Sequence, residues 1–212
     1  MNYQVMQIFE KLVALLVLII LMPLWLLLYV LIKFDSQGPF FFRQRRLGKN
    51  GKEFDIYKIR TMKEDADKLQ KKYEKVNEAN GPVFKIRNDP RYTKIGKIIA
   101  HLGFDELPQL INIIKGEMSF IGPRPLPIAE AQAIPQKYKK REVILPGITS
   151  IWAIRGGHAL TFKEWMESDL EYMQKKSIFL NIYIIFHTLF VLFKAGVIKL
   201  TGLFRNEVSK KE

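Results

Sequence analysis

The sequence predicts a mainly α-helical protein with one short β-hairpin, attached to a membrane through its N-terminal segment. Three observations predict this fold: an uncharged apolar run at residues 12–32, two β-prone runs separated by a turn at residues 40–62, and apolar residues at helical spacing through much of the remainder. We therefore expect three parts: a Pro-broken membrane helix (residues 1–35), a small α+β domain (residues 36–176), and an apolar interfacial helix with a basic tail (residues 177–212).

The composition limits the classes of function. Hydrophobic residues make up 48% of the 212 residues and charged residues 26%, which is typical of a chain with a packed core. The absence of Cys excludes a disulfide framework, a thiolate zinc site and a cysteine nucleophile. The net charge is +13, from 34 Lys and Arg against 21 Asp and Glu, so the expected partners are anions: nucleic acid, anionic lipid headgroups or phosphorylated small molecules.

The apolar run at residues 12–32 is long enough to cross a bilayer, because about 20 apolar residues suffice for a spanning helix. Pro23 lies near its middle and should kink the helix, since proline removes a backbone donor and clashes with the preceding turn. A kinked helix either crosses the membrane or enters it and returns to the same face, and the residues alone do not decide between the two. Basic residues that follow the run place its C-terminal side at the cytoplasm: Arg43, Arg45, Arg46, Lys49 and Lys52.

The remaining elements are a hairpin and several helices. A Gly-Lys-Asn-Gly turn between two β-prone runs predicts the hairpin. Thr161 and Glu164 form a capping-box pattern at the start of one predicted helix. The last predicted helix is strongly apolar but short for a span, so we expect it to be buried or interfacial. The helices are expected at residues 63–79, 93–102, 128–143, 162–173 and 178–193.

Residues 104–125 hold the densest pattern, FDELPQLINIIKGEMSFIGPRP. The apolar spacing predicts a helix that begins near Asp105, because Pro108 is tolerated only in the first turn, and that ends at Gly116. Residues 122–125 are expected to be extended, since a residue before proline avoids the helical region.

Asp105 and Glu106 are the first candidate site. Two carboxylates at a helix start are kept ionised by the helix dipole, which suits a nucleophile or a Mg²⁺ ligand. The alternative is that they only cap the helix. Lys58, Arg60 and Arg124 lie close to turns or strand ends and are candidates for binding phosphate oxygens; taken singly, each is equally consistent with solvated surface charge.

The order of these pieces resembles the monotopic phosphoglycosyl transferases, bacterial sugar transferases that begin polysaccharide and glycoconjugate assembly on undecaprenyl phosphate. The resemblance runs from about residue 11 to about residue 194. It includes the Pro-broken apolar segment and the strings GPFFFRQRRLGKNGKEFDIYKIRTM, NGPVFKIRNDPRYTKIGK, FDELPQLINIIKGEMSFIGPRP and PGITSIW.

The resemblance implies a mechanism and a location. Asp105 matches the nucleophile, which attacks the β-phosphorus of a UDP-sugar, releases UMP and is then attacked by a polyprenyl phosphate. Glu106 matches the Mg²⁺ ligand, with Asp105 beside the same ion, and Arg124 and Arg60 match contacts to the nucleotide or phosphate. The family implies a re-entrant helix in the bacterial inner membrane, with both ends and the catalytic domain on the cytoplasmic face.

The chain departs from the family pattern at several positions. Where relatives usually carry an arginine five residues before the nucleophile, this chain has Ala100, with His101 next to it. Ala153 and Gly157 also replace residues that are common in the family, with Arg155 close by. Three explanations are open: Arg155 or His101 compensates in phosphate binding, the sugar specificity differs, or the activity is reduced. Because Asp105, Glu106 and the Pro-Arg-Pro string persist, we expect an active enzyme with an altered sugar pocket.

Two other classes of function are compatible with parts of the sequence. The positive charge and aromatic-basic runs also suit a membrane-tethered nucleic-acid-binding protein, but no nucleic-acid-binding fold is recognisable, so we expect no nucleic acid partner. A structural membrane adaptor would use the carboxylates only as caps. The expected partners are a UDP-sugar, a polyprenyl phosphate and anionic lipids; the sugar, the glycan and a homodimer are left open.

Overall fold

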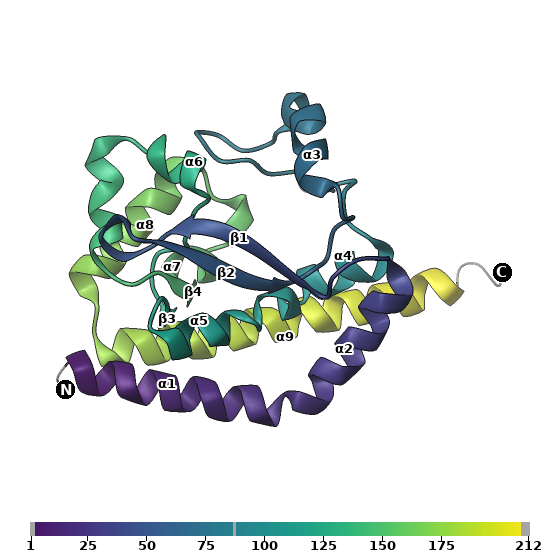
Figure 1. Ribbon diagram of the computed structural model, residues 1–212, viewed down its shortest axis with the longest axis horizontal. Helices are drawn as coiled ribbons and strands as arrows, with labels where there is room; N and C mark the ends of the chain where they lie inside the picture. Colours follow the sequence, from purple (N-terminus) through teal and green to yellow (C-terminus); the bar gives the residue numbers. More distant parts are fainter. Residues whose placement is uncertain (1–2, 87, 209–212) are drawn as a thin grey trace.

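The computed structural model describes residues 3–86 and 88–208. Most described residues are helical, and a short hairpin lies between the helices, which confirms the mainly helical part of the predicted fold class and its hairpin (Figure 1). The α-helices are α1 (Tyr3–Ile20), α2 (Met22–Asp35), α3 (Ala66–Gln70), α4 (Lys94–His101), α5 (Gln109–Lys115), α6 (Ile128–Gln132), α7 (Ile151–Ile154), α8 (Phe162–Lys175) and α9 (Ile178–Val208). The strands are β1 (Phe41–Leu47), β2 (Glu53–Ile59), β3 (Ser119–Ile121) and β4 (Gly147–Thr149).

The N-terminal apolar segment forms a bent helix pair. α1 ends at Ile20, α2 begins at Met22, and the two axes differ by 60°. Pro23 lies in the first turn of α2, where its missing N–H breaks the α1 hydrogen-bond ladder, so the predicted kink is confirmed. Within the described chain, no single helix is both long and apolar enough to span a membrane, whereas the bent pair meets that criterion when its two arms are taken together.

The hairpin is confirmed in position and register. β1 and β2 are antiparallel, with Phe41 opposite Ile59 and Leu47 opposite Glu53. Asn50 adopts a left-handed conformation (φ 55°) in the connecting turn, which asparagine tolerates better than most residues.

A second two-stranded sheet was not predicted. β3 and β4 pair in parallel, from segments that surround Gly122 and Gly147. A Cβ atom on Gly147 would lie 2.0 Å from the backbone nitrogen of Gly122, so only glycine permits this approach. Three-residue strands are too short to show a periodic pattern in the sequence.

Several helix boundaries differ from the predictions. The helix expected to begin near Asp105 begins at Gln109, and Asp105 lies in a separate 3₁₀ turn, η3 (Phe104–Glu106), because Pro108 forms the N-cap of α5. The helix expected over residues 128–143 is split by Pro135 into α6 and a 3₁₀ segment, η4 (Gln136–Val143).

The other expected helices agree better. Thr93 caps α4, and Thr161 and Glu164 form the predicted capping box at the start of α8. Residues 63–79 are only partly helical, as α3 and a 3₁₀ segment, η2 (Lys71–Val76). α9 extends well beyond the predicted Phe193, and residues 209–212 of the expected tail lie outside the described chain.

Apolar clusters fasten the bent pair and α9 to the rest of the chain. Ala14 of α1 packs with Ile113 of α5, and Ile32 of α2 packs with Ile59 of β2. Ile184 of α9 packs in a further cluster with residues of β3, α7 and α8. The hairpin and the short helices around it are therefore packed directly on the apolar helices.

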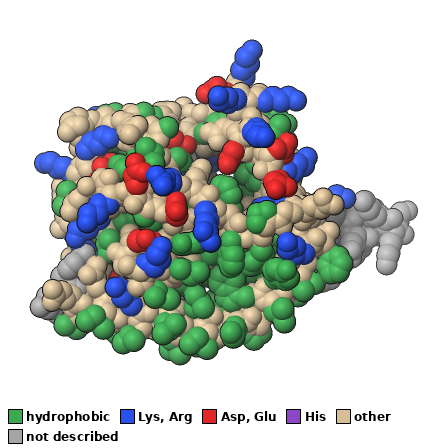
Figure 2. Space-filling view, viewed as in Figure 1, with side chains coloured by type: hydrophobic (Ala, Val, Ile, Leu, Met, Phe, Trp, Pro, Cys, Tyr) green, Lys and Arg blue, Asp and Glu red, His purple; other side chains and the backbone are tan. Residues whose placement is uncertain are grey.

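The outer faces of these helices remain apolar. In Figure 2, hydrophobic side chains cover the lower edge of the molecule, where Figure 1 shows α1 and α2, and basic side chains lie above them. α9 adds exposed aromatic side chains at Phe179, Phe186, Phe190 and Phe193. An exposed apolar surface of this extent is typical of a membrane contact. The exposed apolar side chains of α1 and α2 are Val5, Ile8, Phe9, Leu12, Leu15, Leu16, Ile19, Ile20, Met22, Leu26, Leu27, Tyr29, Val30 and Phe34.

Candidate active site

Asp105 and Glu106 lie in the η3 turn between α4 and α5. Gly103 makes this turn possible, because its φ of 73° reverses the chain at the end of α4. Pro108 then starts α5 in a new direction. The acidic pair is therefore placed on a tight corner between two helices, and Asp105 is only 8% exposed.

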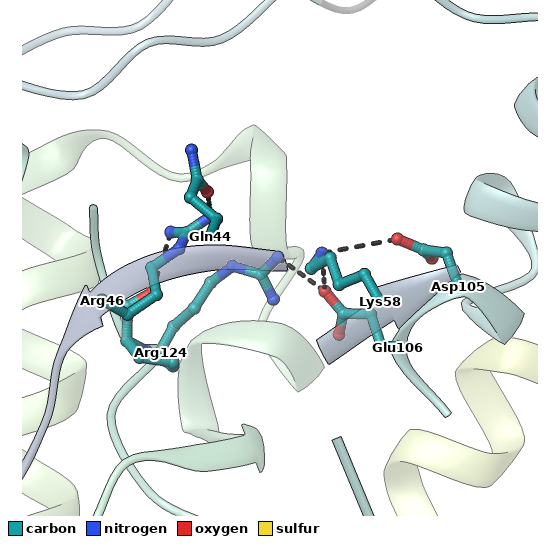
Figure 3. Close-up of polar contacts among 7 residues, drawn as sticks. Gln44, Arg46, Lys58, Asp105, Glu106 and Arg124 are labelled. Atoms are coloured by element: carbon teal, nitrogen blue, oxygen red, sulfur yellow. Dashed lines mark hydrogen bonds and ion pairs between the residues drawn. The ribbon is translucent and has the colours of Figure 1, made fainter. Parts of the chain in front are cut away.

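Lys58 and Arg124 bring two positive charges to this corner from distant parts of the chain (Figure 3). The Lys58 ammonium, on β2, lies 2.9 Å from Oε1 of Glu106 and 3.4 Å from Oδ2 of Asp105. The Arg124 guanidinium donates to the same Oε1 of Glu106 at 2.6 Å. Glu106 thus accepts from both cations, whereas Asp105 has one long contact.

A second arginine–carboxylate pair holds Arg124 in place. Arg141 forms a buried pair with Asp169 of α8, with 2.7 Å between Nη2 and Oδ2. The same Nη2 of Arg141 donates to the backbone oxygen of Arg124 at 2.7 Å. The Arg124 guanidinium also lies 5.7 Å from the ring centroid of Trp152, a cation–π contact. Backbone and side chain of Arg124 are therefore both anchored.

The two neighbouring carboxylates have different electrostatic states. Burial raises the pKa of Asp105 to about 6; Lys58 opposes this rise and Glu106 adds to it. Burial also disfavours the charged form of Glu106, but Arg124 and Lys58 outweigh it and hold the pKa of Glu106 well below its usual range. At neutral pH both groups are ionised, but Asp105 is the one whose charge the protein compensates incompletely.

A cavity of about 470 Å³ opens beside Asp105. Lys58, Arg124 and Tyr92 share its lining with Asp105, and apolar walls come from the hairpin and from Trp152. Seven basic and four acidic side chains line it among the described residues, so the cavity favours an anionic ligand. Its volume is in the range of small-molecule sites.

Arg60 also lines the cavity, but its guanidinium is engaged by the backbone. It is 5% exposed and donates to the carbonyl oxygens of Pro39 (2.6 Å), Ser36 (2.9 Å) and Gln37, with a longer contact to Gly38 (3.5 Å). These bonds fix the chain that leaves α2 against the end of β2. Arg60 therefore connects the bent helix pair to the cavity wall.

Arg155 and His101 lie outside the cavity lining. Arg155 forms an exposed ion pair with Glu171 of α8. His101 is exposed at the end of α4, with its Nδ1 2.6 Å from the Lys97 carbonyl oxygen. Its ring lies 6.4 Å from that of Tyr92, which does line the cavity. The structure thus brings together Asp105, Glu106, Lys58 and Arg124, and leaves Arg155 and His101 apart from them.

Arg46 lines the cavity, although the sequence analysis uses it only as one of the basic residues that indicate the cytoplasmic side of the membrane segment. From the end of β1, it donates to the Pro125 carbonyl oxygen at 3.0 Å. The signal that could have found it is the strand alternation, since β1 exposes Phe41, Arg43 and Arg45 and turns the residues between them inward.

The described residues contain no cluster of three or more His, Asp or Glu side chains that could enclose a metal ion. Asp105 and Glu106 do converge on one cation, the Lys58 ammonium. Mg²⁺ is commonly held by only one or two carboxylates, together with substrate phosphates and water, so this pair fits the donor set.

A family model described as "Bacterial sugar transferase" matches residues 1–195. The chain belongs to the bacterial sugar transferases. It is 37% identical to the exopolysaccharide production protein ExoY of Sinorhizobium fredii over 185 aligned residues. The alignment covers 85% of this chain and 82% of that protein. This sugar transferase is therefore an enzyme of the transferase class.

Longer relatives also match most of this sugar transferase. The UDP-glucose:undecaprenyl-phosphate glucose-1-phosphate transferase of Escherichia coli is 36% identical over 186 residues, 84% of this chain and 38% of that protein. The galactosyl transferase CpsE of Streptococcus agalactiae is 42% identical over 153 residues, 72% of this chain and 34% of that protein.

Proposed function

We propose that this sugar transferase moves a sugar-1-phosphate from a UDP-sugar to a polyprenyl phosphate of the undecaprenyl type, the step that begins polysaccharide or glycoconjugate assembly. The observation that carries the proposal is the incompletely paired carboxylate of Asp105 beside Lys58 and Arg124 in a cavity with a positive lining. The Escherichia coli relative, whose name states a UDP-glucose donor and an undecaprenyl-phosphate acceptor, supports the same substrate classes.

The proposed reaction has two displacements at phosphorus. A carboxylate oxygen of Asp105 attacks the β-phosphorus of the UDP-sugar, the bond from that phosphorus to the bridging oxygen breaks, and UMP leaves with the electron pair. The sugar-1-phosphate is then bound covalently to Asp105. A phosphate oxygen of the polyprenyl phosphate attacks this phosphorus, the bond to Asp105 breaks, and the carboxylate is regenerated.

The described contacts suit this chemistry. Phosphoryl transfer requires charge stabilisation and in-line positioning more than acid–base groups. Lys58 and Arg124 lie where negative charge would accumulate on the transferred phosphate. Asp105 is ionised at neutral pH yet has only one contact of 3.4 Å to a cation, so its oxygens are less stabilised than those of Glu106 and are better placed to attack.

Asp105 and Glu106 are proposed to hold Mg²⁺, with Glu106 as the principal ligand because its pKa is held low and it stays ionised. When bound, the ion supplies neutralisation of the donor diphosphate and of the leaving group. The chain's own contribution is to hold the two carboxylates on the η3 turn, and to keep Lys58 and Arg124 within reach of the same oxygens.

The membrane arrangement is part of the proposal. We propose that the bent α1–α2 pair is re-entrant, that the outer apolar faces of α1, α2 and α9 contact a membrane containing anionic lipid, and that the cavity lies on the cytoplasmic face. The support is the 60° bend and the packing of both arms onto the cavity domain through Ala14 and Ile32. In the proposed arrangement the cavity opens beside the membrane surface, where the phosphate of a polyprenyl acceptor would lie.

The transfer itself is tested on the full chain in nanodiscs with Mg²⁺ and a panel of UDP-sugars labelled at the β-phosphate. One sugar should release UMP and, without acceptor, label the protein at Asp105; adding undecaprenyl phosphate should move the label to lipid. Asp105→Asn should abolish labelling, and the control Asp55→Asn, at a half-exposed aspartate of β2, should not. Transfer of label to lipid without any labelled protein intermediate would refute the covalent mechanism.

The topology is tested separately. Because the chain has no Cys, single cysteines can be introduced at exposed Gln4 of α1 and Gln37 after α2. A re-entrant pair predicts that a membrane-impermeant maleimide reaches both positions from the same side of sealed vesicles. Labelling from opposite sides would show that the segment spans the membrane.

A further inference from the structure

Arg46 is a partly buried cationic side chain whose hydrogen bonds, within the described chain, go to neutral groups. Its two terminal nitrogens donate to the Pro125 carbonyl oxygen (3.0 Å) and to Oε1 of Gln44 (2.5 Å). Its Nε is buried and has no acceptor among the residues that the structure describes. A charged donor buried in this way is costly unless a further acceptor is bound.

The charges around Arg46 strengthen this point. Within the described ranges, no carboxylate oxygen forms an ion pair with Arg46, whereas Arg91 and Arg141 each have a buried aspartate partner. Burial, and then the positive charge of Arg124, lower the pKa of Arg46 to about 10, with Glu130 and Glu106 acting in the opposite direction. Arg46 thus lines the cavity beside a second guanidinium, that of Arg124, and its own charge has no paired carboxylate among the described residues.

A second buried donor belongs to another residue of the same cavity lining. Trp165 of α8 lines it and is 9% exposed, and its indole N–H has no acceptor in the described part of the chain. Buried indole N–H groups usually have a hydrogen-bond partner. Two residues of the cavity lining, Arg46 and Trp165, therefore each keep a buried N–H group without an acceptor in the described part of the chain.

The position of Arg46 relative to Asp105 identifies which part of a ligand it would meet. Figure 3 shows Asp105 at one end of the polar cluster and Arg46 at the other, with the Arg124 side chain extending between them. In an in-line displacement the leaving group departs on the side of the phosphorus opposite the nucleophile. With Asp105 as nucleophile, the leaving phosphate lies toward Arg46.

We propose that Arg46 binds the phosphate of the departing nucleotide, the α-phosphate of the bound UDP-sugar, while Lys58 and Arg124 bind the phosphate that is transferred. This inference rests on the proposed function and adds a nucleotide-phosphate subsite to it. The planar guanidinium of Arg46 suits a phosphate because its two terminal nitrogens each carry a second N–H, besides those that Pro125 and Gln44 accept, and can donate in parallel. UMP as product occupies the same subsite.

The experiment compares inhibition by UMP and by uridine in Arg46→Gln, Arg46→Lys and a matched control. The control is Arg45→Gln, since Arg45 is adjacent on β1, has a 71% exposed side chain and pairs with Glu53 and Asp55 away from the cavity. Arg46→Gln should weaken inhibition by UMP by about tenfold or more and raise the donor KM similarly, while inhibition by uridine, which has no phosphate, changes by less than about twofold. The control should match the wild type.

Each contrary result has a distinct meaning. A wild-type enzyme that neither turns over a UDP-sugar nor binds UMP overturns both the proposed function and this subsite. If Arg46→Gln turns over the donor and is inhibited by UMP as strongly as the wild type, the subsite alone is overturned. A fall in kcat without a change in UMP inhibition also overturns it, because Arg46 would then only position the Pro125 segment. Should Arg46→Gln not fold, Arg46→Lys decides: it keeps the charge but not the parallel donors, so UMP inhibition should weaken by about threefold, and no change overturns the subsite.

Discussion

The protein has two neighbouring groups of arginine and carboxylate side chains, one around Arg141 and one around Arg124, and they differ in how completely their charges are paired. Arg141 and Asp169 are both buried and contact each other through two guanidinium nitrogens, at 2.7 and 2.8 Å. In the cavity, Arg124 and Lys58 both contact the same oxygen of Glu106, and Asp105 keeps a single contact of 3.4 Å. In the first group both charges are buried and paired with each other. In the second, Asp105 is weakly paired, and it lines the cavity together with Lys58 and Arg124, where a ligand can reach them.

The difference separates structural from functional charge. A buried pair that is fully hydrogen-bonded adds little net stability to the fold. Removing one partner is strongly destabilising, because it leaves a buried charge without compensation. An incompletely paired cluster at a cavity is a candidate functional site, because burial together with specific charged partners shifts pKa values in the way that catalytic sites require. The two groups are also coupled, since Arg141 donates to the backbone of Arg124 and so fixes the cluster in position.

The largest expected effect comes from opening the closed pair. Asp169→Ala should lower the stability of the fold by about 3–5 kcal/mol, because it leaves Arg141 buried without a partner and releases its hold on Arg124. Thermal denaturation in detergent measures the loss. The control is Glu171→Ala on the same helix, whose ion pairs with Arg155 and Lys175 are more exposed and should cost about 1 kcal/mol or less. Equal losses in the two variants would remove the distinction.

Neutralising Asp105 and neutralising its neighbour Glu106 should have opposite effects on stability. The raised pKa of Asp105 means that its charge opposes folding at pH 8, so Asp105→Asn should stabilise the fold, by on the order of 2 kcal/mol at most. The pKa of Glu106 is depressed, so Glu106→Gln should destabilise it by a similar amount, with the loss of both cationic contacts. Melting temperatures at pH 8 in the presence of a chelator test this, and a lower value for Asp105→Asn would contradict it.

The stability difference between wild type and Asp105→Asn should depend on pH. The folded state holds the Asp105 proton up to about pH 6, above its unfolded pKa of 3.8, so the folded wild type binds more protons in this interval and gains stability as the pH falls. The advantage of Asp105→Asn should therefore shrink between about pH 6 and about pH 4. Chelator-treated wild type, Asp105→Asn and Asp55→Asn are compared across this range. A difference that stays constant with pH would show that Asp105 has an ordinary pKa in the fold.

The smallest effect is expected at Arg155. Its pair with Glu171 is exposed and outside the cavity, so Arg155→Ala should change the transfer rate by less than about fivefold. The resemblance to relatives instead suggested a phosphate contact here. Initial rates at saturating and limiting donor concentrations distinguish the two views, since a phosphate contact would raise the donor KM by tenfold or more.

The comparison also shows which parts of the site the sequence could predict. Asp105, Glu106, Lys58 and Arg124 were identified from residue type, order and family resemblance, and the structure brings their side chains together. The engagement of Arg60 by four carbonyl groups could not be predicted, because its acceptors belong to a loop whose path depends on how α2 packs. Arg46 was missed because strand alternation shows which residues turn inward but not what they meet there.

The sequence by itself determined the local elements: the break at Pro23, the hairpin, the caps at Thr93 and Thr161, and the end of α5 at Gly116. These depend on the backbone preferences of one residue and its neighbours, which are encoded locally. Three features were decided only by the tertiary structure. They are the parallel pairing of β3 with β4, the opposite pKa shifts of Asp105 and Glu106, and the lack of a paired carboxylate beside Arg46 in the described chain. Each of these arises from burial and from groups distant in the chain, and the energy of a charge depends on its surroundings rather than on its sequence neighbours.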